Sequence, residues 1–235
     1  MKIFKNACVA LLCGSMLLGM GSCNMSNTGK GALIGGGGGA GVGAGVGALI
    51  GGGKGAAIGA GVGAAVGAGV GALIGNKMDK QKKELEEQLA NSGAKIEEST
   101  DDNGLKSIRV TFDGGILFPT GKWDLNEQAK ADLSRFASNL KNNPDTDVQV
   151  LGFTDNTGTY AANEKVSTNR ADAVKTFLVN QGVGASRISA QGIPMADYVA
   201  SNETAEGRAP NRRVEVFITA NEHMIKQAEA EAAGK

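Results

Sequence analysis

The chain has 235 residues, no net charge at neutral pH and only 4% aromatic residues. Because the charge is balanced and no basic cluster is interleaved with aromatics, the composition excludes the usual signs of nucleic-acid binding, and no nucleic-acid partner is expected. The 37 glycines are the unusual part. They indicate one ordinary domain joined to a segment of a different kind.

The first 22 residues have the features of a secretory signal peptide. Lys2 and Lys5 precede an apolar run over residues 7–20, and two small residues come before Cys23. The apolar run is too short to span a bilayer, so we expect residues 1–22 to be removed. The mature chain would then begin at Cys23.

Cys23 resembles the lipidated cysteine of bacterial lipoproteins, although Met20 stands where leucine is usual three positions earlier. Cys8 and Cys13 lie in the signal peptide and no cysteine follows, so the mature chain has no partner for a disulfide. We therefore expect Cys23 to carry acyl chains such as palmitate, the alternative being an ordinary signal peptide with a spare thiol. Asn24 is not the aspartate of inner-membrane retention signals, which favours the outer membrane.

A short polar tether, residues 23–30, leads into a glycine-rich tandem repeat over residues 31–75. Glycine occupies every fourth position, and Lys54 is the only charge. Each glycine costs a helix in water about 1 kcal/mol relative to alanine, but small residues let helices pack closely in a bilayer. The repeat predicts a glycine-zipper helical hairpin with its break at residues 51–54, the alternative being a flexible glycine-rich linker.

The chain becomes charged after the repeat, and residues 76–94 are predicted to form a solvated linker helix. A domain over residues 95–220 follows. Residues 96–112 alternate around a turn and predict a hairpin, and a loop at residues 118–122 comes next. Asp124 and Glu127 resemble a capping box at the start of a helix that ends before Pro144.

A strand, a loop and a helix over residues 147–181 carry the candidate site. Residues 147–153 alternate as a strand does, and turn-forming residues follow. Apolar residues at helical spacing predict a helix over residues 161–181. Asn163 and Arg170 lie on the stripe of this helix that faces the sheet, so their polar groups are expected to be buried near the loop.

An acid in the loop, Asp155, and a base on the helix, Arg170, suggest a site for a ligand that carries both an ammonium and a carboxylate. Asp155 would take the ammonium, and the planar fork of Arg170 would grip the carboxylate with two hydrogen bonds. The alternative is that the two residues form a structural ion pair with each other.

A set of motif residues resembles the peptidoglycan-binding domain of the OmpA family. They are Gly152, Thr154, Asp155, Gly158, Asn163, Ser167, Arg170 and Ala171, followed later by Asn211, Arg212, Arg213, Val214 and Glu215. The resemblance implies an α+β fold, a mixed sheet with two helices in β-α-β-α-β order. It also implies that Asp155 and Arg170 bind the free amino-acid end of diaminopimelate in the peptide stem of the wall, with help from Asn163. Thr154, directly before Asp155, is also expected to belong to the peptidoglycan-binding site.

The remaining segments complete the sheet. Residues 187–191 and 214–218 alternate as strands do, and one of the two arginines before the last strand, Arg212 or Arg213, is expected to brace the site loop. The tail, residues 221–235, is expected to be flexible or helical.

The sequence lacks the residues that an enzyme's active site usually needs. His223 in the tail is the only histidine, no cysteine follows Cys23, and no carboxylate pair with acid and base spacing lies in the site loop. No metal or cofactor site is expected. The sequence predicts an outer-membrane lipoprotein that faces the periplasm. This lipoprotein would tether the outer membrane to peptidoglycan without a covalent bond. The alternative is a glycine-zipper oligomer or pore with the wall-binding domain as an accessory, and a homo-oligomer is left open.

Overall fold

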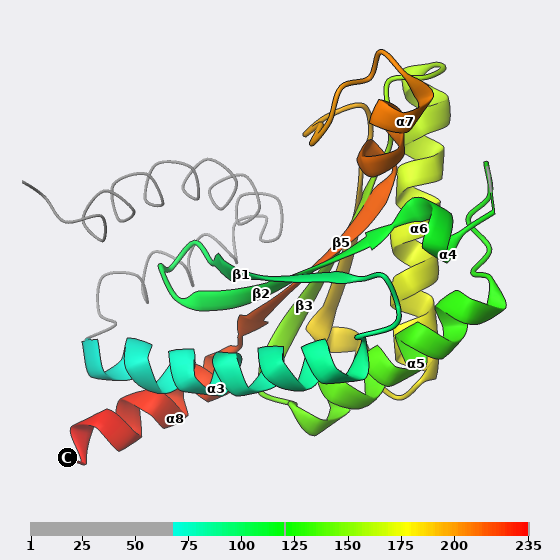
Figure 1. Ribbon diagram of the computed structural model, residues 1–235. Coiled ribbons are helices and arrows are strands. Elements are labelled where there is room, and N and C mark those ends of the chain that lie inside the picture. The colour runs from blue at the N-terminus through cyan, green and yellow to red at the C-terminus, as the bar shows by residue number, and fades with distance from the viewer. Residues whose placement is uncertain (1–67, 120, 235) are drawn as a thin grey trace, which may run out of the picture. The chain divides into compact units, whose positions relative to one another are not determined.

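The computed structural model describes residues 68–119 and 121–234 (Figure 1). The predicted signal peptide, the tether with Cys23 and residues 31–67 of the repeat lie outside the described residues. Among the helices of the described ranges, none is both long and apolar enough to cross a bilayer.

Five strands form one mixed sheet in the order β1-β2-β5-β3-β4. Their bounds are Lys95–Thr100 for β1, Lys106–Asp113 for β2, Thr146–Phe153 for β3, Ile188–Ile193 for β4 and Arg213–Ala220 for β5. Neighbouring strands are antiparallel except for the parallel pair β3 and β4. The predicted α+β fold with a mixed sheet is confirmed.

The last strand in the sequence lies in the middle of the sheet. Val216 of β5 pairs with Val110 of β2 on one side and with Val150 of β3 on the other. All three side chains are buried in the main core, because residues paired across neighbouring strands point to the same face of the sheet. The start of β5 is thereby placed beside the end of β3, where the candidate site begins.

Helix α5, Glu127–Asn142, packs its apolar stripe on the main core, as its sequence predicts. Its cap differs from the prediction. The helix starts one residue after Asn126, whose side chain accepts a hydrogen bond from the backbone nitrogen of Ala129. The predicted capping box at Asp124 and Glu127 is wrong, because Asp124 lies outside the turn that needs a cap.

Helix α6, Tyr160–Asn180, lies close to strands β3 and β4. Gly152 of β3 and Gly192 of β4 are partners in the sheet and face Ser167 of this helix. A methyl group at Gly152 would lie 2.3 Å from the carbonyl oxygen of Ser167, a distance that no side chain tolerates. These two glycines bring the helix close enough for its early residues to reach the strand ends.

The helix before the sheet, α3, covers Ala68–Gln88 and is packed on the domain. One of its faces is fully buried in the main core and carries Ile74, Met78 and Leu85, and Leu89, directly after the helix, is buried with them. The predicted helix is present as far as Gln88, but it is not a solvated linker, because its apolar residues pack against the sheet and α5. The predicted boundary between repeat and linker, at residues 75 and 76, also falls inside α3.

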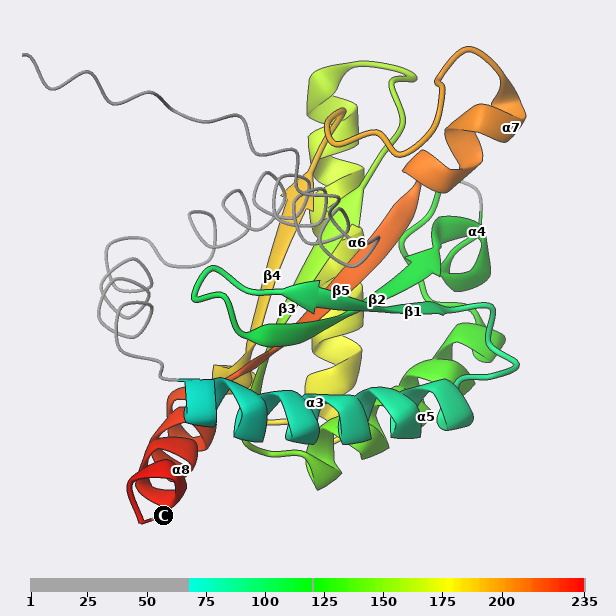
Figure 2. The same ribbon diagram turned by 60° about the vertical axis from the view of Figure 1, so that its left-hand side comes forward.

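The tail, which was predicted to be either flexible or helical, forms helix α8, Glu222–Ala233. It lies alongside α3 in both views (Figures 1 and 2). Met224, Ile225 and Ala228 are buried there. The N-terminal and C-terminal ends of the described chain are thus packed together on the domain.

Four short helices complete the fold. They are α4 over Gly114–Leu117, η1 over Ala185–Arg187, α7 over Ala205–Arg208 and η2 over Ala209–Asn211. Helix α4 follows β2 directly, and α7 and η2 lead into β5. Both of these connections border the candidate site.

Candidate functional site

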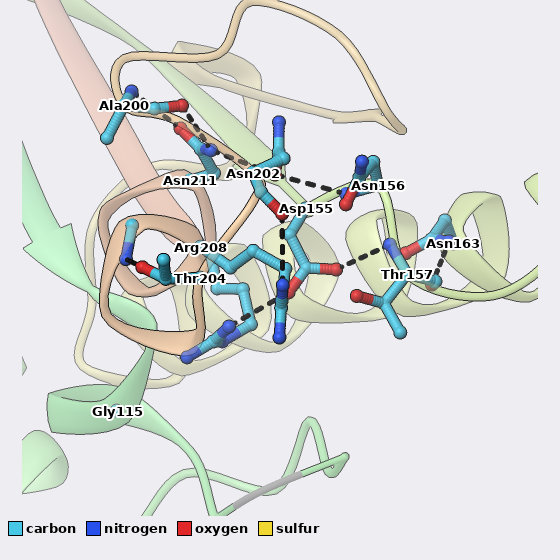
Figure 3. Close-up of polar contacts among 12 residues, drawn as sticks. Gly115, Asp155, Asn156, Thr157, Asn163, Ala200, Asn202, Thr204, Arg208 and Asn211 are labelled. Carbon is cyan, nitrogen blue, oxygen red and sulfur yellow. Dashed lines mark hydrogen bonds and ion pairs between the residues drawn. The ribbon is translucent and has the colours of Figure 1, made fainter.

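Asp155 lies in the loop that leaves β3 and is only 7% exposed. Its carboxylate is held at both oxygens (Figure 3). Oδ1 accepts a hydrogen bond of 2.8 Å from the backbone nitrogen of Thr157, and Oδ2 accepts one of 2.8 Å from Nη1 of Arg212. Arg212 is the residue just before β5, and the sheet order places the start of β5 next to the end of β3.

The environment keeps Asp155 ionised. Burial on its own would raise the pKa of this carboxyl, because a charge loses its hydration. The hydrogen bonds from Arg212 and Thr157, together with the charge of Arg212, outweigh that effect and hold the pKa below its usual value. Asp155 is therefore a fixed negative charge at neutral pH.

Arg170 projects from α6 toward the sheet and is 5% exposed, as its place on the buried stripe predicts. Its Nε donates a hydrogen bond of 3.1 Å to the carbonyl oxygen of Lys122, and its guanidinium lies 5.1 Å from the ring centre of Phe118. Within the described ranges, its two terminal nitrogens have no hydrogen-bond acceptor and no ion pair. The side chain is positioned by one nitrogen and leaves two for another partner.

The predicted alternative of an ion pair between Asp155 and Arg170 is not found in the described part of the chain. Asp155 does form an ion pair, but its partner is Arg212. The charge of Asp155 still acts on Arg170. The pKa of Arg170 is lowered by burial and by the charge of Arg212, and Asp155 opposes that shift.

Two guanidiniums and one carboxylate share the site. An arginine stays protonated at any physiological pH, so the three side chains carry a net charge of one positive unit. The side chain of Arg212 is 41% exposed and stays accessible from solvent. The arrangement favours a ligand that brings at least one carboxylate in addition to an ammonium.

Gly114, at the start of α4, brings a third segment to the two arginines. Its backbone nitrogen donates a hydrogen bond of 2.7 Å to the carbonyl oxygen of Arg212. A methyl group at Gly114 would lie 2.4 Å from that oxygen and 3.5 Å from Nη1 of Arg170. The absence of a side chain here lets the backbone after β2 approach the site.

The other two predicted site residues hold loops in place. Nδ2 of Asn163 donates hydrogen bonds to the carbonyl oxygens of Thr157, at 2.8 Å, and Thr159, at 3.1 Å. Thr154 accepts a hydrogen bond of 3.0 Å from the backbone nitrogen of Met195. Both side chains are buried. Asn163 shapes the loop of Asp155, and Thr154 fastens that loop to the segment after β4.

A buried asparagine, Asn211, organises the loop that faces Asp155 across the site. Its Oδ1 accepts hydrogen bonds from the backbone nitrogens of Val199 and Ala200, and its Nδ2 donates to the carbonyl oxygen of Ala200 and to Oδ1 of Asn202. Asn202 in turn accepts a hydrogen bond of 3.4 Å from the backbone nitrogen of Asn156 (Figure 3). The two loops are thereby linked.

Arg213 braces this second loop. Its Nε pairs with Glu215 at 2.6 Å, its Nη2 donates to the carbonyl oxygen of Asp197, and its guanidinium lies 3.9 Å from the ring centre of Phe153. The expectation that one of Arg212 and Arg213 braces the site loop is confirmed for Arg212, which binds Asp155 of that loop. The motif that contains both arginines was the available signal, but it does not say which side chain points to the site.

The described residues contain no cluster of histidine, cysteine, aspartate and glutamate arranged to hold a metal ion. The site offers charged hydrogen-bond partners, Asp155, Arg170 and Arg212, which the two loops and α6 hold in place.

Comparison with known families identifies both parts of the chain. Residues 117–212 match the profile of the OmpA family, and residues 1–83 match the profile described as YMGG-like Gly-zipper. The first match covers the site from the end of α4 to Arg212. The second includes the predicted signal peptide and the whole glycine repeat.

Individual relatives agree with these matches. The chain is 40% identical over 145 residues to the probable lipoprotein YiaD of Escherichia coli, covering 62% of this chain and 64% of YiaD. It is 44% identical over 112 residues to the peptidoglycan-binding protein ArfA of Mycobacterium tuberculosis, covering 48% of this chain and 34% of ArfA. The chain thus spans less than two thirds of the length of these relatives.

A solved structure shares the fold. The cell wall anchor of the T6SS from Pseudomonas aeruginosa superposes with a TM-score of 0.51 at 30% identity, covering 58% of this chain and 97% of that one. Residues 117–212 therefore form an OmpA-family domain, and the N-terminal part of the chain matches the YMGG-like Gly-zipper family.

Proposed function

We propose that the protein is a binding module that tethers the outer membrane to peptidoglycan without a covalent bond, and that it is not an enzyme. It faces the periplasm and is anchored by a lipid on Cys23. The domain binds the diaminopimelate end of the stem peptide. The names of two similar proteins, peptidoglycan-binding ArfA and the cell wall anchor of the T6SS, support wall binding.

The observation that carries the proposal is the state of Arg170 beside Asp155. Among the described residues, Arg170 donates a hydrogen bond only through Nε, and its two terminal nitrogens are left for a ligand carboxylate. A carboxylate bound by both of them forms the parallel pair of hydrogen bonds for which a guanidinium is suited. Asp155, ionised and held at a fixed angle, takes the ammonium of the same amino-acid end.

Arg212 has two roles in this binding. It orients Asp155 before the ligand arrives, which reduces the entropy that binding must overcome. It also supplies the second positive charge of the site. A stem peptide carries further carboxylates near its diaminopimelate, so this charge favours the whole ligand and not only its end.

A tether of this kind needs only modest affinity at each site. Two charge-assisted contacts to a small zwitterion give a weak single interaction. A lipid anchor keeps the domain next to a wall that repeats the same ligand many times, which raises the effective concentration. The membrane and the wall are then held together while individual contacts exchange.

A glycine-zipper oligomer or pore is the second candidate function. The match of residues 1–83 to the Gly-zipper family favours it, because small residues at regular spacing let helices associate in a bilayer. Size-exclusion chromatography of the detergent-extracted protein distinguishes the two candidate functions. A defined large oligomer supports the pore, and a monomer or small species supports the tether.

The test of wall binding is sedimentation of the full-length protein with purified peptidoglycan. Asp155→Asn and Arg170→Ala are expected to leave the protein in the supernatant, whereas Glu127→Gln and Lys141→Ala, at exposed positions of α5, are expected to sediment like the wild type. Thermal unfolding of each variant checks that the fold is kept. Sedimentation of both site variants at the wild-type level would assign Asp155 and Arg170 to structure.

The anchor is tested separately by fractionating cells that express Cys23→Ser. The lipid anchor predicts release of this variant into the soluble periplasm. Retention in the membrane fraction would show that the glycine-rich segment holds the protein there.

A further inference from the structure

A pocket lies next to the candidate site, between helices α5 and α6 and the loop that precedes α5. Its volume is about 460 Å³. Trp123 and Phe177 contribute apolar surface, and both are half-buried. The polar lining includes Asp124, Asn169, Asp172 and Thr176.

The lining combines aromatic surface with short hydrogen-bonding side chains. The indole of Trp123 is held partly by the ammonium of Lys165, which lies 5.8 Å from the ring centre. An aromatic face contributes stacking energy to a flat partner with C–H groups, and carboxylate, amide and hydroxyl groups exchange hydrogen bonds with hydroxyls. A sugar ring presents both kinds of surface. The lining carries the two carboxylates of Asp124 and Asp172 and one ammonium, of Lys130, so its net charge is negative and disfavours a phosphate or another anion.

The pocket and the site share two pairs of adjacent residues. Lys122 accepts the hydrogen bond that positions Arg170, and Trp123 is the next residue in the chain. On helix α6, Asn169 in the pocket immediately precedes Arg170 in the site. An extended peptide spans about 3.5 Å per residue. A ligand whose charged end binds at Arg170 can therefore reach the pocket with its next few residues.

We propose that this pocket is a saccharide subsite, which binds a sugar of the glycan strand from which the bound stem peptide hangs. The proposal rests on the proposed function, because it assigns a second contact to the same wall polymer. Trp123 stacks on the sugar ring, and Asn169, Asp172 and Thr176 exchange hydrogen bonds with its hydroxyl or acetamido groups. The protein then reads the peptide and the glycan together, which distinguishes intact wall from released peptides.

The test compares three probes by calorimetry with the full-length protein in detergent. They are a disaccharide joined to a diaminopimelate tetrapeptide, the same tetrapeptide without sugars, and glycan strands stripped of their peptides. We expect the wild type to bind the first probe more tightly than the second. Loss of the aromatic face in Trp123→Ala should weaken the first probe about tenfold and change the second less than about twofold.

A second variant guards against a loss of fold in Trp123→Ala. Thr176→Arg, at an exposed position on α6, places a long side chain in the pocket and should weaken the first probe in the same way. Trp123→Phe keeps an aromatic ring and should retain much of the affinity. Ser138→Arg, at an exposed position of α5 away from the pocket, is the matched control and should bind like the wild type.

The outcomes separate the two proposals. Equal affinity of the wild type, Trp123→Ala and Thr176→Arg for the disaccharide probe would overturn the saccharide subsite while the peptide site stands. A wild type that binds stripped glycan, lost in Trp123→Ala, supports the subsite even if no tetrapeptide binds. In that case the diaminopimelate site fails on its own.

Discussion

Asp155 and Arg212 are 57 positions apart in the sequence and joined by an ion pair of 2.8 Å. The pair exists because β5 inserts beside β3, so that the residue before one strand meets the residues after the other. It fixes the carboxylate that we assign to the ligand ammonium. The sheet order is thus part of the binding site.

The first prediction concerns the loss of this pair. Arg212→Ala removes a hydrogen bond and a positive charge from Asp155, while the bond from Thr157 remains. The pKa of Asp155 should rise, because burial is then opposed by fewer partners. Titration of the Asp155 carboxyl by NMR measures the change, and Arg212→Lys should restore part of the shift. An unchanged pKa in Arg212→Ala would contradict the role given to the arginine.

The second prediction is the pH dependence of wall binding. The pKa of Asp155 is lowered in the folded protein, so its carboxyl is ionised at any pH above the ordinary value of about 3.9. Its negative charge is lost only as the pH falls through the lowered pKa. Binding to peptidoglycan should therefore be constant from about pH 7 to about pH 5. It should fall only below about pH 4.

Binding is the appropriate readout here, not the global free energy of unfolding. The pKa of Asp101 is raised, mainly by burial, so this group affects stability with the opposite sign in the same pH range. A loss of binding with a midpoint near pH 6 would show that a group other than Asp155 controls the site.

Much of the candidate site could be predicted from local sequence. The strand, turn residues and helical period around Asp155 and Arg170 gave the elements to within a residue or so, because those signals are local. The partner of Asp155 could not be obtained in this way. Arg212 reaches Asp155 through strand order, which depends on contacts between residues far apart in the sequence.

Helix α3 shows the same limit in the fold. Its charged surface predicted a solvated linker, and its few apolar residues indicated too narrow a seam for a core. In the structure the apolar residues of α3 pack on the sheet, on α5 and on α8, which lies at the far end of the sequence. A buried hydrogen bond of 3.0 Å between Gln81 of α3 and Asn139 of α5 adds to this packing. The partner surfaces come from three separate segments, so no local pattern reveals them.

The third prediction follows from the packing of α3. Leu85 is fully buried, and Leu85→Ala should lower the free energy of unfolding by about 2 to 5 kcal/mol. Lys83→Ala, at an exposed position of the same helix, should change it by no more than about 0.5 kcal/mol. Urea unfolding of the two variants makes the comparison. A similar small effect for both would mean that α3 is a linker after all.

The fourth prediction concerns Asn211. Asn211→Ala would leave the backbone nitrogens of Val199 and Ala200 without their acceptor. Because Val199 is exposed and water can replace part of what is lost, the free energy of unfolding should fall by about 1 kcal/mol. The loop would no longer be fastened to that of Asp155, so affinity for the tetrapeptide should fall as well. Asn211→Asp keeps the acceptor but turns a buried carboxylate oxygen toward the oxygens of Ala200 and Asn202, so it should be no more stable to heat than Asn211→Ala. Wild-type stability and affinity in Asn211→Ala would remove this residue from the account.

The most direct test of the site is the affinity of the full-length protein for two tetrapeptides that differ at one residue, diaminopimelate or lysine. Lysine keeps the ammonium that Asp155 binds and lacks the carboxylate that Arg170 binds. Calorimetry should show tighter binding of the diaminopimelate peptide by roughly tenfold to a hundredfold, the worth of a charge-assisted pair of hydrogen bonds. Equal affinity for the two peptides would contradict the assignment of Arg170 to the ligand.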